Sequence, residues 1–325
     1  MNGEFFPDDQ INPAVLEAKR VGVVGYGNQG RAHCLNLRDL GVEVTVGQRP
    51  GAGFDQAIAD GFSPVTIREA TETSDLLMLT LPDEHMPSIY ESEIATELNA
   101  GSCLLFCHGF AVHFGFLVPP SDVDVALVAP KGAGAKLRSE FEAGRGLMGL
   151  VGVHQDRSGQ AQELALAYGW GIGCARVGLM ETSFKEECET DLFGEQTVLC
   201  GGIPELIKAG YETLVEAGYS PQAAYLETLH EAKLITDLLY AEGLAGMRAR
   251  ISDTAEWGGY QTGESLVDEG VKERMKATLD RIQSGEFAKG WMAETSSGKK
   301  RLLESRQNEA DSEIETVGSE IRKRL

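Results

Sequence analysis

The chain has 325 residues, 42% hydrophobic and 7% aromatic, and this length and composition predict about two globular domains. Its formal net charge of −21 repels nucleic-acid backbones and anionic membranes, so we expect neither as a partner. Residues 1–20 lack the apolar run of a signal peptide, and no later window approaches about 18 uninterrupted apolar residues. We therefore expect a cytoplasmic protein.

From residue 20 to about 180, short apolar runs alternate with helical stretches. Strands are predicted at 20–27, 42–47, 75–82, 103–109, 123–132, 147–154 and 172–178. Helices are predicted between them at 28–40, 55–60, 84–99 and 157–168. Continuous apolar strands separated by helices indicate a doubly wound parallel sheet covered on both faces.

The character changes near residue 182, after which the sequence shows helical periodicity and no convincing strand. Helices are predicted at 183–200, 203–217, 221–246, 264–283 and 310–324. The polar stretch 294–312 is either a surface connection or a frayed helix. We therefore divide the chain into an α/β domain of Rossmann type, residues 1–182, and an all-helical domain, residues 183–325.

The six cysteines show neither a CxxC pair nor the spacing of a zinc site, so free, buried thiols are expected. Cys107 adjoins His108, but neighbours on a strand point to opposite faces. We interpret Cys107 as a core residue rather than as half of a thiol–imidazole pair.

A glycine-rich loop follows the first predicted strand and opens the first helix. It reads Gly25-Tyr26-Gly27-Asn28-Gln29-Gly30 and fits the G-x-G-x-x-G pattern. In dinucleotide-binding domains these glycines permit a tight turn, close approach of the backbone to a pyrophosphate, and close helix packing. The alternative is that the glycines serve only a tight turn.

The end of the second strand decides which dinucleotide fits. An acidic residue there usually binds the ribose diol of NAD, but residues 44–54 contain no acid and place Arg49 at this point. A guanidinium suits the 2′-phosphate of NADPH. The alternative is an exposed loop arginine without a ligand.

Two acidic pairs stand at i,i+4 spacing in apolar helical segments: Asp191 with Glu195, and Glu227 with Glu231. This spacing puts both carboxylates of a pair on one helix face, where like charges repel each other. Oxygen-only ligands favour Mg²⁺, so the four carboxylates predict a magnesium site. Taken alone, each pair is also compatible with a solvated helix face.

These motifs resemble, in order and spacing, those of ketol-acid reductoisomerase, the acetohydroxyacid isomeroreductase of valine, leucine and isoleucine biosynthesis. The segments that carry the resemblance are GYGNQGRAHCLNLRDLG, VGQRPG, CHGF, APKGAG, ETDLFGEQ, YLETLHEAKLITDL and ISDTAEWG. The length is similar to that of the short class I form. The resemblance implies a knotted helical domain and an intertwined homodimer with interface active sites, which in some members assembles into dodecamers.

The resemblance also implies roles for individual residues. Asp191 would bridge two Mg²⁺ ions, Glu195 would bind one of them, and Glu227 and Glu231 would complete the other from the partner subunit. His108 and Lys131 would complete the catalytic site, with Glu231 as our candidate for assisting proton movement. Further matches lie at Ser252 for substrate binding, although a serine there also suits a helix N-cap, and at Asp83 and Gly134 near the nucleotide.

The cofactor loop departs from the family pattern. Relatives commonly carry serines after the arginine, whereas residues 49–54 have no hydroxyl, and Gly53 stands where relatives carry serine. We therefore expect NADPH, NADH or both as cofactor. Smaller departures, which remove no metal ligand, are Met86, Ala133, Ala135 and Thr228.

The reaction implied is the Mg²⁺-dependent conversion of 2-acetolactate or 2-aceto-2-hydroxybutanoate, both 2-hydroxy-3-oxo acids, into 2,3-dihydroxy-3-methyl acids. An alkyl group migrates and NAD(P)H then reduces the product. One alternative is a metal-independent β-hydroxyacid dehydrogenase, which has no use for four convergent carboxylates. Another is a non-catalytic module that senses NAD(P).

Overall fold

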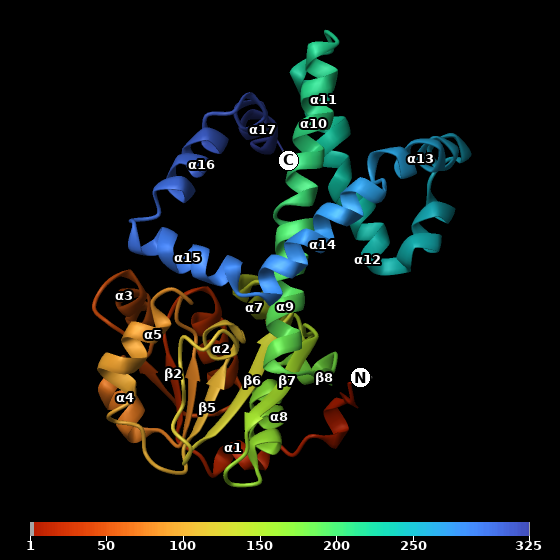
Figure 1. Ribbon diagram of the computed structural model, residues 1–325. Helices are drawn as coiled ribbons and strands as arrows, with labels where there is room; N and C mark the ends of the chain where they lie inside the picture. The colour runs from red at the N-terminus through yellow and green to blue at the C-terminus, as the bar shows by residue number, and fades with distance from the viewer. Residues whose placement is uncertain (1–2, 325) are drawn as a thin grey trace. The chain divides into compact units, whose positions relative to one another are not determined.

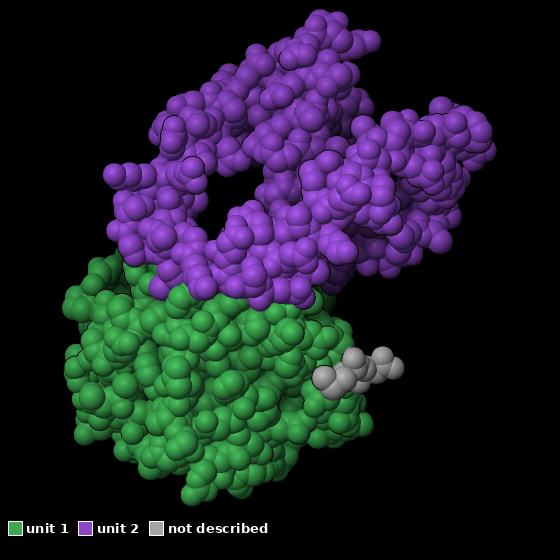
Figure 2. Space-filling view, viewed as in Figure 1, with its two compact units in different colours: residues 1–190 green, residues 191–325 purple. Residues whose placement is uncertain are grey.

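The computed structural model describes residues 3–324 and divides into two compact units between Thr190 and Asp191 (Figure 2). This division falls inside helix α9, Phe184–Gly194. Our boundary at 182/183 lies just before that helix and stays a prediction.

Unit 1 is built on a single eight-stranded sheet (Figure 1). Its strands are β1 (Phe5–Phe6), β2 (Val21–Val24), β3 (Val44–Gly47), β4 (Leu76–Leu79), β5 (Cys103–Phe106), β6 (Asp124–Pro130), β7 (Gly149–Gln155) and β8 (Leu179–Glu181). The spatial order is β1-β8-β7-β6-β5-β4-β2-β3. The five strands from β3 to β6 are parallel, whereas β7 runs antiparallel to β6, and β1 to β8. The predicted parallel sheet is therefore confirmed for its central part.

Both faces of the sheet are buried, as the apolar strands predict. Successive residues point to opposite faces, so Val21 and Val23 join one hydrophobic cluster while Val24 joins the other. Helices α2 and α8 pack on strands of the sheet, as does α4. The helices of this unit are α1 (Ala14–Glu17), α2 (Asn28–Asp39), α3 (Ala52–Ala59), α4 (Ile67–Thr73), α5 (Met86–Ile89), α6 (Phe110–His113), α7 (Gly134–Glu142) and α8 (Ala161–Gly171).

The strand order creates a crevice at the carboxyl end of β2. The chain leaves β2 to form β3 on one side, then returns to form β4 on the other. Open α/β sheets bind their ligands at such a switch point. The glycine-rich loop directly follows β2 and therefore lies where a dinucleotide is expected.

The strand predicted at 172–178 is wrong. This stretch forms a 3₁₀ turn at Cys174–Arg176, between Gly173 with φ 90° and Gly178 with φ 137°. Such left-handed glycine conformations break an extended strand. The strand begins only at Leu179, where β8 pairs in parallel with β7.

Unit 2 consists of helices, and the structure describes no strand between residues 191 and 324, as predicted. Its helices are α10 (Gly202–Glu216), α11 (Pro221–Tyr225), α12 (Glu231–Arg250), α13 (Asp253–Leu266), α14 (Glu269–Gln283), α15 (Glu286–Ser296), α16 (Lys300–Ala310) and α17 (Glu313–Arg322). The polar stretch 294–312 lies mostly in helices α15 and α16, so of its two alternatives the helical one is nearer to the structure. The predicted helix 264–283 is interrupted because Asp268 caps α14 by accepting from the Val271 N–H.

Two π-helical segments interrupt the helices that carry the acidic pairs. Segment η4 (Glu195–Leu199) follows α9, and η5 (Leu226–His230) separates α11 from α12. Single-turn π segments are rare and often mark functional sites. Across the described chain, no helix combines the length and apolar character that a membrane span requires.

Candidate functional site

The glycine loop has the backbone that a pyrophosphate site needs. Gly25 has φ +97°, which only glycine adopts readily, and a Cβ on Gly30 would lie 2.0 Å from the Gly25 carbonyl oxygen. Gly27 differs, because a Cβ there would meet no heavy atom within 4 Å. No packing contact therefore requires glycine at position 27, and the space beside it is open to a ligand.

Helix α7 forms the second wall of this site. A Cβ on Gly134 would lie 1.9 Å from the Asn28 carbonyl oxygen, so the contact between α7 and the glycine loop requires glycine. The Gln29 side chain donates to the Gly132 carbonyl at 2.9 Å. Between the walls lies a cavity of about 220 Å³, lined by Tyr26, Gly27, Asn28, Arg31, Ala32, Gly134, Ala135 and Arg138. Two arginines in this lining suit an anionic ligand.

Asp60 fixes two of these lining residues. Its carboxylate accepts from the Tyr26 hydroxyl at 2.9 Å and from Arg31 Nε at 2.6 Å. The hydrogen bond from Arg31, joined by that from Tyr26, lowers the pKa of Asp60 to about 2 despite partial burial. The carboxylate stays charged at neutral pH and holds both side chains beside the glycine loop.

The cofactor loop is more crowded than its sequence indicates. Arg49 is not an unpartnered loop arginine, because its guanidinium pairs with Glu93 at 2.6 Å. Gly53 lies in the first turn of α3, where a Cβ would stand 3.0 Å from Gln48 Nε2 and 3.2 Å from the Tyr26 carbonyl oxygen. A serine at this position would require Gln48 to shift.

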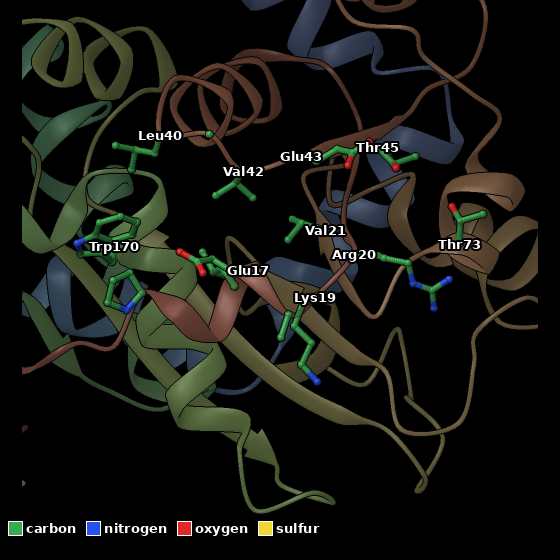
Figure 3. Close-up of a pocket in the computed structure, with 14 residues that line it drawn as sticks. Glu17, Lys19, Arg20, Val21, Leu40, Val42, Glu43, Thr45, Thr73 and Trp170 are labelled. Atoms are coloured by element: carbon green, nitrogen blue, oxygen red, sulfur yellow. The ribbon is translucent and has the colours of Figure 1, made fainter.

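A larger cavity, of about 810 Å³, lies away from the crevice (Figure 3). Val21 and Thr45, at the beginnings of β2 and β3, belong to its lining. Ligands of open α/β sheets bind at the opposite, carboxyl ends of the strands. This cavity is therefore no candidate for the dinucleotide.

A buried carboxylate joins the two predicted catalytic residues of unit 1. Glu187 is 1% exposed and accepts from Lys131 Nζ at 2.9 Å and from the Gly109 N–H at 2.8 Å. The same carboxylate lies 3.1 Å from His108 Nδ1. Sequence reasoning missed Glu187, although it stands four residues before Asp191 and thereby extends the i,i+4 spacing of the acidic pair.

The charges in this cluster compensate one another. Burial opposes ionisation of Glu187, but its contacts with His108 and Lys131 outweigh burial and lower its pKa to about 2. Burial likewise opposes protonation of His108, yet contacts with Cys188 and Glu187 raise its pKa well above the usual value. Cys107 points elsewhere: its thiol donates to the Leu79 carbonyl and its pKa is raised to about 12 by burial. The core interpretation of Cys107 is confirmed, and all six cysteines are free, but the expectation of burial is wrong for Cys200, which is exposed.

Helix α9 brings one predicted metal ligand to this cluster. Because α9 continues through Gly194, Asp191 lies one turn after Glu187 on the same face. Two carboxylates one turn apart on one helix suit a hard divalent cation.

The remaining predicted residues occupy four different settings. Glu195 begins segment η4, directly after α9, whereas Glu227 in η5 and Glu231 at the start of α12 are exposed. Ser252 is the N-cap of α13 and accepts from the Ala255 N–H at 3.2 Å, so the N-cap alternative is confirmed. Asp83 lies in the connection after β4, at the carboxyl edge of the sheet.

Comparison with known proteins gives consistent results along the chain. Residues 15–178 match the NADPH-binding domain of acetohydroxy acid isomeroreductase, and residues 184–325 match the ketol-acid reductoisomerase C-terminal domain. The structure of an NADH-preferring ketol-acid reductoisomerase from an uncultured archean is similar over 99% of both chains, with 42% identity and a TM-score of 0.97.

Two further structures share only the fold. A putative oxidoreductase from Jannaschia sp. CCS1 is 14% identical, with 83% of this chain and 97% of that chain covered and a TM-score of 0.63. A semialdehyde dehydrogenase NAD-binding protein from Cupriavidus necator is 16% identical, with coverages of 81% and 99% and a TM-score of 0.63.

Proposed function

This chain belongs to the ketol-acid reductoisomerase family, and we propose that it converts 2-acetolactate and 2-aceto-2-hydroxybutanoate into 2,3-dihydroxy-3-methyl acids. It is an oxidoreductase of branched-chain amino-acid biosynthesis with an NAD(P)-binding domain. The proposal concerns the substrates, the requirement for Mg²⁺ and the residues that act. Its cofactor is NADPH or NADH, and the solved relative from an uncultured archean prefers NADH.

The observation that carries the proposal is the buried Glu187. One carboxylate orients His108 and Lys131 on one side, while helix α9 presents Asp191 one turn further on. A simple dehydrogenase has no need of a metal-ligand carboxylate beside its proton-transfer groups. An isomeroreductase needs both, because a metal would polarise the oxygens on the two neighbouring carbons between which the alkyl group migrates, and protons move in both migration and reduction.

Mg²⁺ fits the donor set of this site. We propose Asp191 and Glu195 from one chain, with Glu227 and Glu231 from the partner subunit, as ligands of two ions. When bound, Mg²⁺ supplies Lewis-acid polarisation of the substrate's hydroxyl and carbonyl oxygens, and the nicotinamide supplies hydride. The exposure of Glu227 and Glu231 leaves these carboxylates accessible to a second chain.

Side chains of the protein transfer the proton and orient the substrate. Glu231 accepts the proton of the tertiary hydroxyl as the alkyl group migrates to the neighbouring carbon. Lys131 Nζ, held by Glu187 Oε1, donates a hydrogen bond to the substrate oxygen that gains negative charge. His108, also fixed by Glu187, and the Ser252 hydroxyl orient the substrate.

The nucleotide is placed by the loop after β2. The open position at Gly27 accepts the pyrophosphate at the N-terminus of α2, and Gly134 closes the opposite wall. Asp83, at the same edge of the sheet, contributes to the nucleotide site. Arg49 and Gly53 lie at the adenosine end, where NADPH and NADH differ.

We also propose a cytoplasmic homodimer with active sites at its interface, able to assemble into a dodecamer. Several large apolar side chains of unit 2 are exposed in the single chain, including Tyr240 at 92%, Leu244 at 77% and Trp257 at 67%. Apolar groups exposed in such numbers are typical of an interface.

The decisive experiment follows conversion of 2-acetolactate with each cofactor, with and without Mg²⁺. We expect turnover only with Mg²⁺. A β-hydroxyacid dehydrogenase would reduce or oxidise substrate without metal, and a sensor would bind cofactor without turnover. Either result would overturn the proposal.

A further inference from the structure

Arg49, just beyond strand β3, is held by a carboxylate from a distant part of the chain. Its Nε donates to Glu93 Oε1 at 2.8 Å, and its Nη2 lies 2.6 Å from the same oxygen. Glu93 lies 44 residues further along the sequence, in the π-helical segment η2 (Tyr90–Ile94). The Glu93 side chain is 22% exposed and that of Arg49 is 52% exposed, so the carboxylate is the more confined partner.

Segment η2 is anchored on two sides. Tyr90 and Ile94, which begin and end it, are 5% and 0% exposed. On the surface, Arg68 of α4 donates to the Ser92 carbonyl oxygen and pairs with Glu97 at 2.5 Å. Glu93 therefore extends from a fixed backbone, and its negative charge stays beside the cofactor loop.

We propose that Glu93 is a specificity-determining residue that favours NADH over NADPH by occupying Arg49. The inference rests on the proposed nucleotide site. A 2′-phosphate carries about two negative charges, so whether it shares Arg49 with Glu93 or displaces Glu93, it lies next to that carboxylate and is repelled by it. The ribose 2′-hydroxyl of NADH is uncharged. It can donate a hydrogen bond to the Glu93 carboxylate.

The surrounding charges support this assignment. Among residues 48–54, Arg49 is the single cation and none carries a hydroxyl, while Asp55 adds a negative charge in the first turn of α3. Rossmann domains that use NAD usually place an acid at the end of the second strand. Here β3 ends without one, and Glu93 supplies the carboxylate from another element.

The pair has little importance for folding by itself, because exposed ion pairs contribute little stability. We therefore expect the Arg49–Glu93 pair to affect the affinity for the cofactor. The test compares Glu93→Gln with the matched control Glu97→Gln, which changes a second carboxylate of the same region that pairs with Arg68. The full-length protein is used, and NADPH and NADH are titrated separately by the fluorescence of the bound nicotinamide, alongside kcat/KM with 2-acetolactate.

We expect Glu93→Gln to raise the ratio of NADPH to NADH affinity by about five- to tenfold, as removal of one close like charge predicts. Glu97→Gln should change the ratio by less than about twofold. An unchanged ratio in Glu93→Gln, or an equal change in both variants, overturns the inference. If both nucleotides bind but 2-acetolactate is not converted, the proposed reaction fails while the affinity ratio still decides the role of Glu93. If neither nucleotide binds the wild type, both proposals fall.

Discussion

Lys131 Nζ lies 2.9 Å from Glu187 Oε1, and the same carboxylate is 3.1 Å from His108 Nδ1. One buried anion thus sets the position of two proposed catalytic groups. We predict that Glu187→Gln lowers kcat by about a hundredfold or more, as expected when general acid–base groups lose their orientation. The variant should also lose about 3 kcal/mol of unfolding free energy, because breaking a buried ion pair leaves a charge uncompensated.

The matched control is Glu186→Gln, an exposed carboxyl on the same helix. Steady-state kinetics and urea unfolding of both variants check the prediction. Wild-type turnover in Glu187→Gln would show that His108 and Lys131 are positioned by other contacts.

Asp191→Asn should abolish conversion of 2-acetolactate while leaving the fold intact, because the residue is proposed to contact both Mg²⁺ ions. Reduction of the already rearranged 2-oxo acid should retain slight activity, since it places less demand on the second ion. Calorimetric titration with Mg²⁺ provides a readout independent of turnover. The control is a variant of an exposed carboxyl, such as Glu304→Gln. If turnover and metal affinity of Asp191→Asn match those of this control, the two-metal assignment is wrong.

Mixed dimers test where the second pair of ligands comes from. Inactive Asp191→Asn protein combined with inactive Glu227→Gln protein should regain some activity after subunits exchange, because one site in the mixed dimer then has both wild-type pairs. Mass spectrometry verifies that mixed dimers are present. No recovery in verified mixed dimers would place all four ligands on one chain.

Asp60 makes stability depend on pH. The pKa of Asp60 in the folded state is about 2, below the ordinary value near 4. Its contribution to the free energy of unfolding is therefore present above about pH 4 and is lost as the pH falls towards 2. After allowance for screening at a partly buried site, Asp60→Asn should cost about 1 kcal/mol at pH 7 and almost nothing near pH 2. Urea unfolding across this range checks it, with exposed Asp55→Asn as control. If Asp60→Asn lowered the free energy of unfolding equally at every pH, the ionic explanation would be wrong.

We predict weak discrimination between NADPH and NADH in the wild type, and a shift towards NADPH in Gly53→Ser. The proper reference is Gly53→Ala, because any Cβ at this position presses on Gln48, which lies 3.0 Å away. Relative to alanine, the serine hydroxyl should improve kcat/KM for NADPH by roughly tenfold if it reaches the 2′-phosphate, as a hydrogen bond to a charged acceptor predicts. Arg49→Asp should favour NADH.

Measurement of kcat/KM with both cofactors in all four proteins decides this point. A wild-type preference for NADPH above about a hundredfold, or 2.7 kcal/mol, would mean that other groups hold the phosphate. Equal effects of serine and alanine would mean that residue 53 acts only through packing.

The sequence by itself determined the parts of this protein that depend on near neighbours. Apolar runs such as 103–106 predicted buried strands, because alternating side chains of one strand meet both faces of the sheet. The pattern at residues 25–30 predicted the nucleotide loop, because a tight turn and close packing exclude a Cβ at two of its glycines. The acidic pairs were visible because helical spacing is itself local.

Tertiary structure decided the contacts that join distant segments. Glu187 contacts His108, which is 79 residues away in the sequence, and Glu93 contacts Arg49, which is 44 residues away. Helical or strand periodicity cannot predict contacts at such separations. The left-handed glycines that replaced a predicted strand at 172–178, and the π segments beside the acidic pairs, likewise depend on how the chain is packed. Periodicity specifies which face of an element is apolar, but the strand order of the sheet decides which polar side chains face one another once those faces are buried.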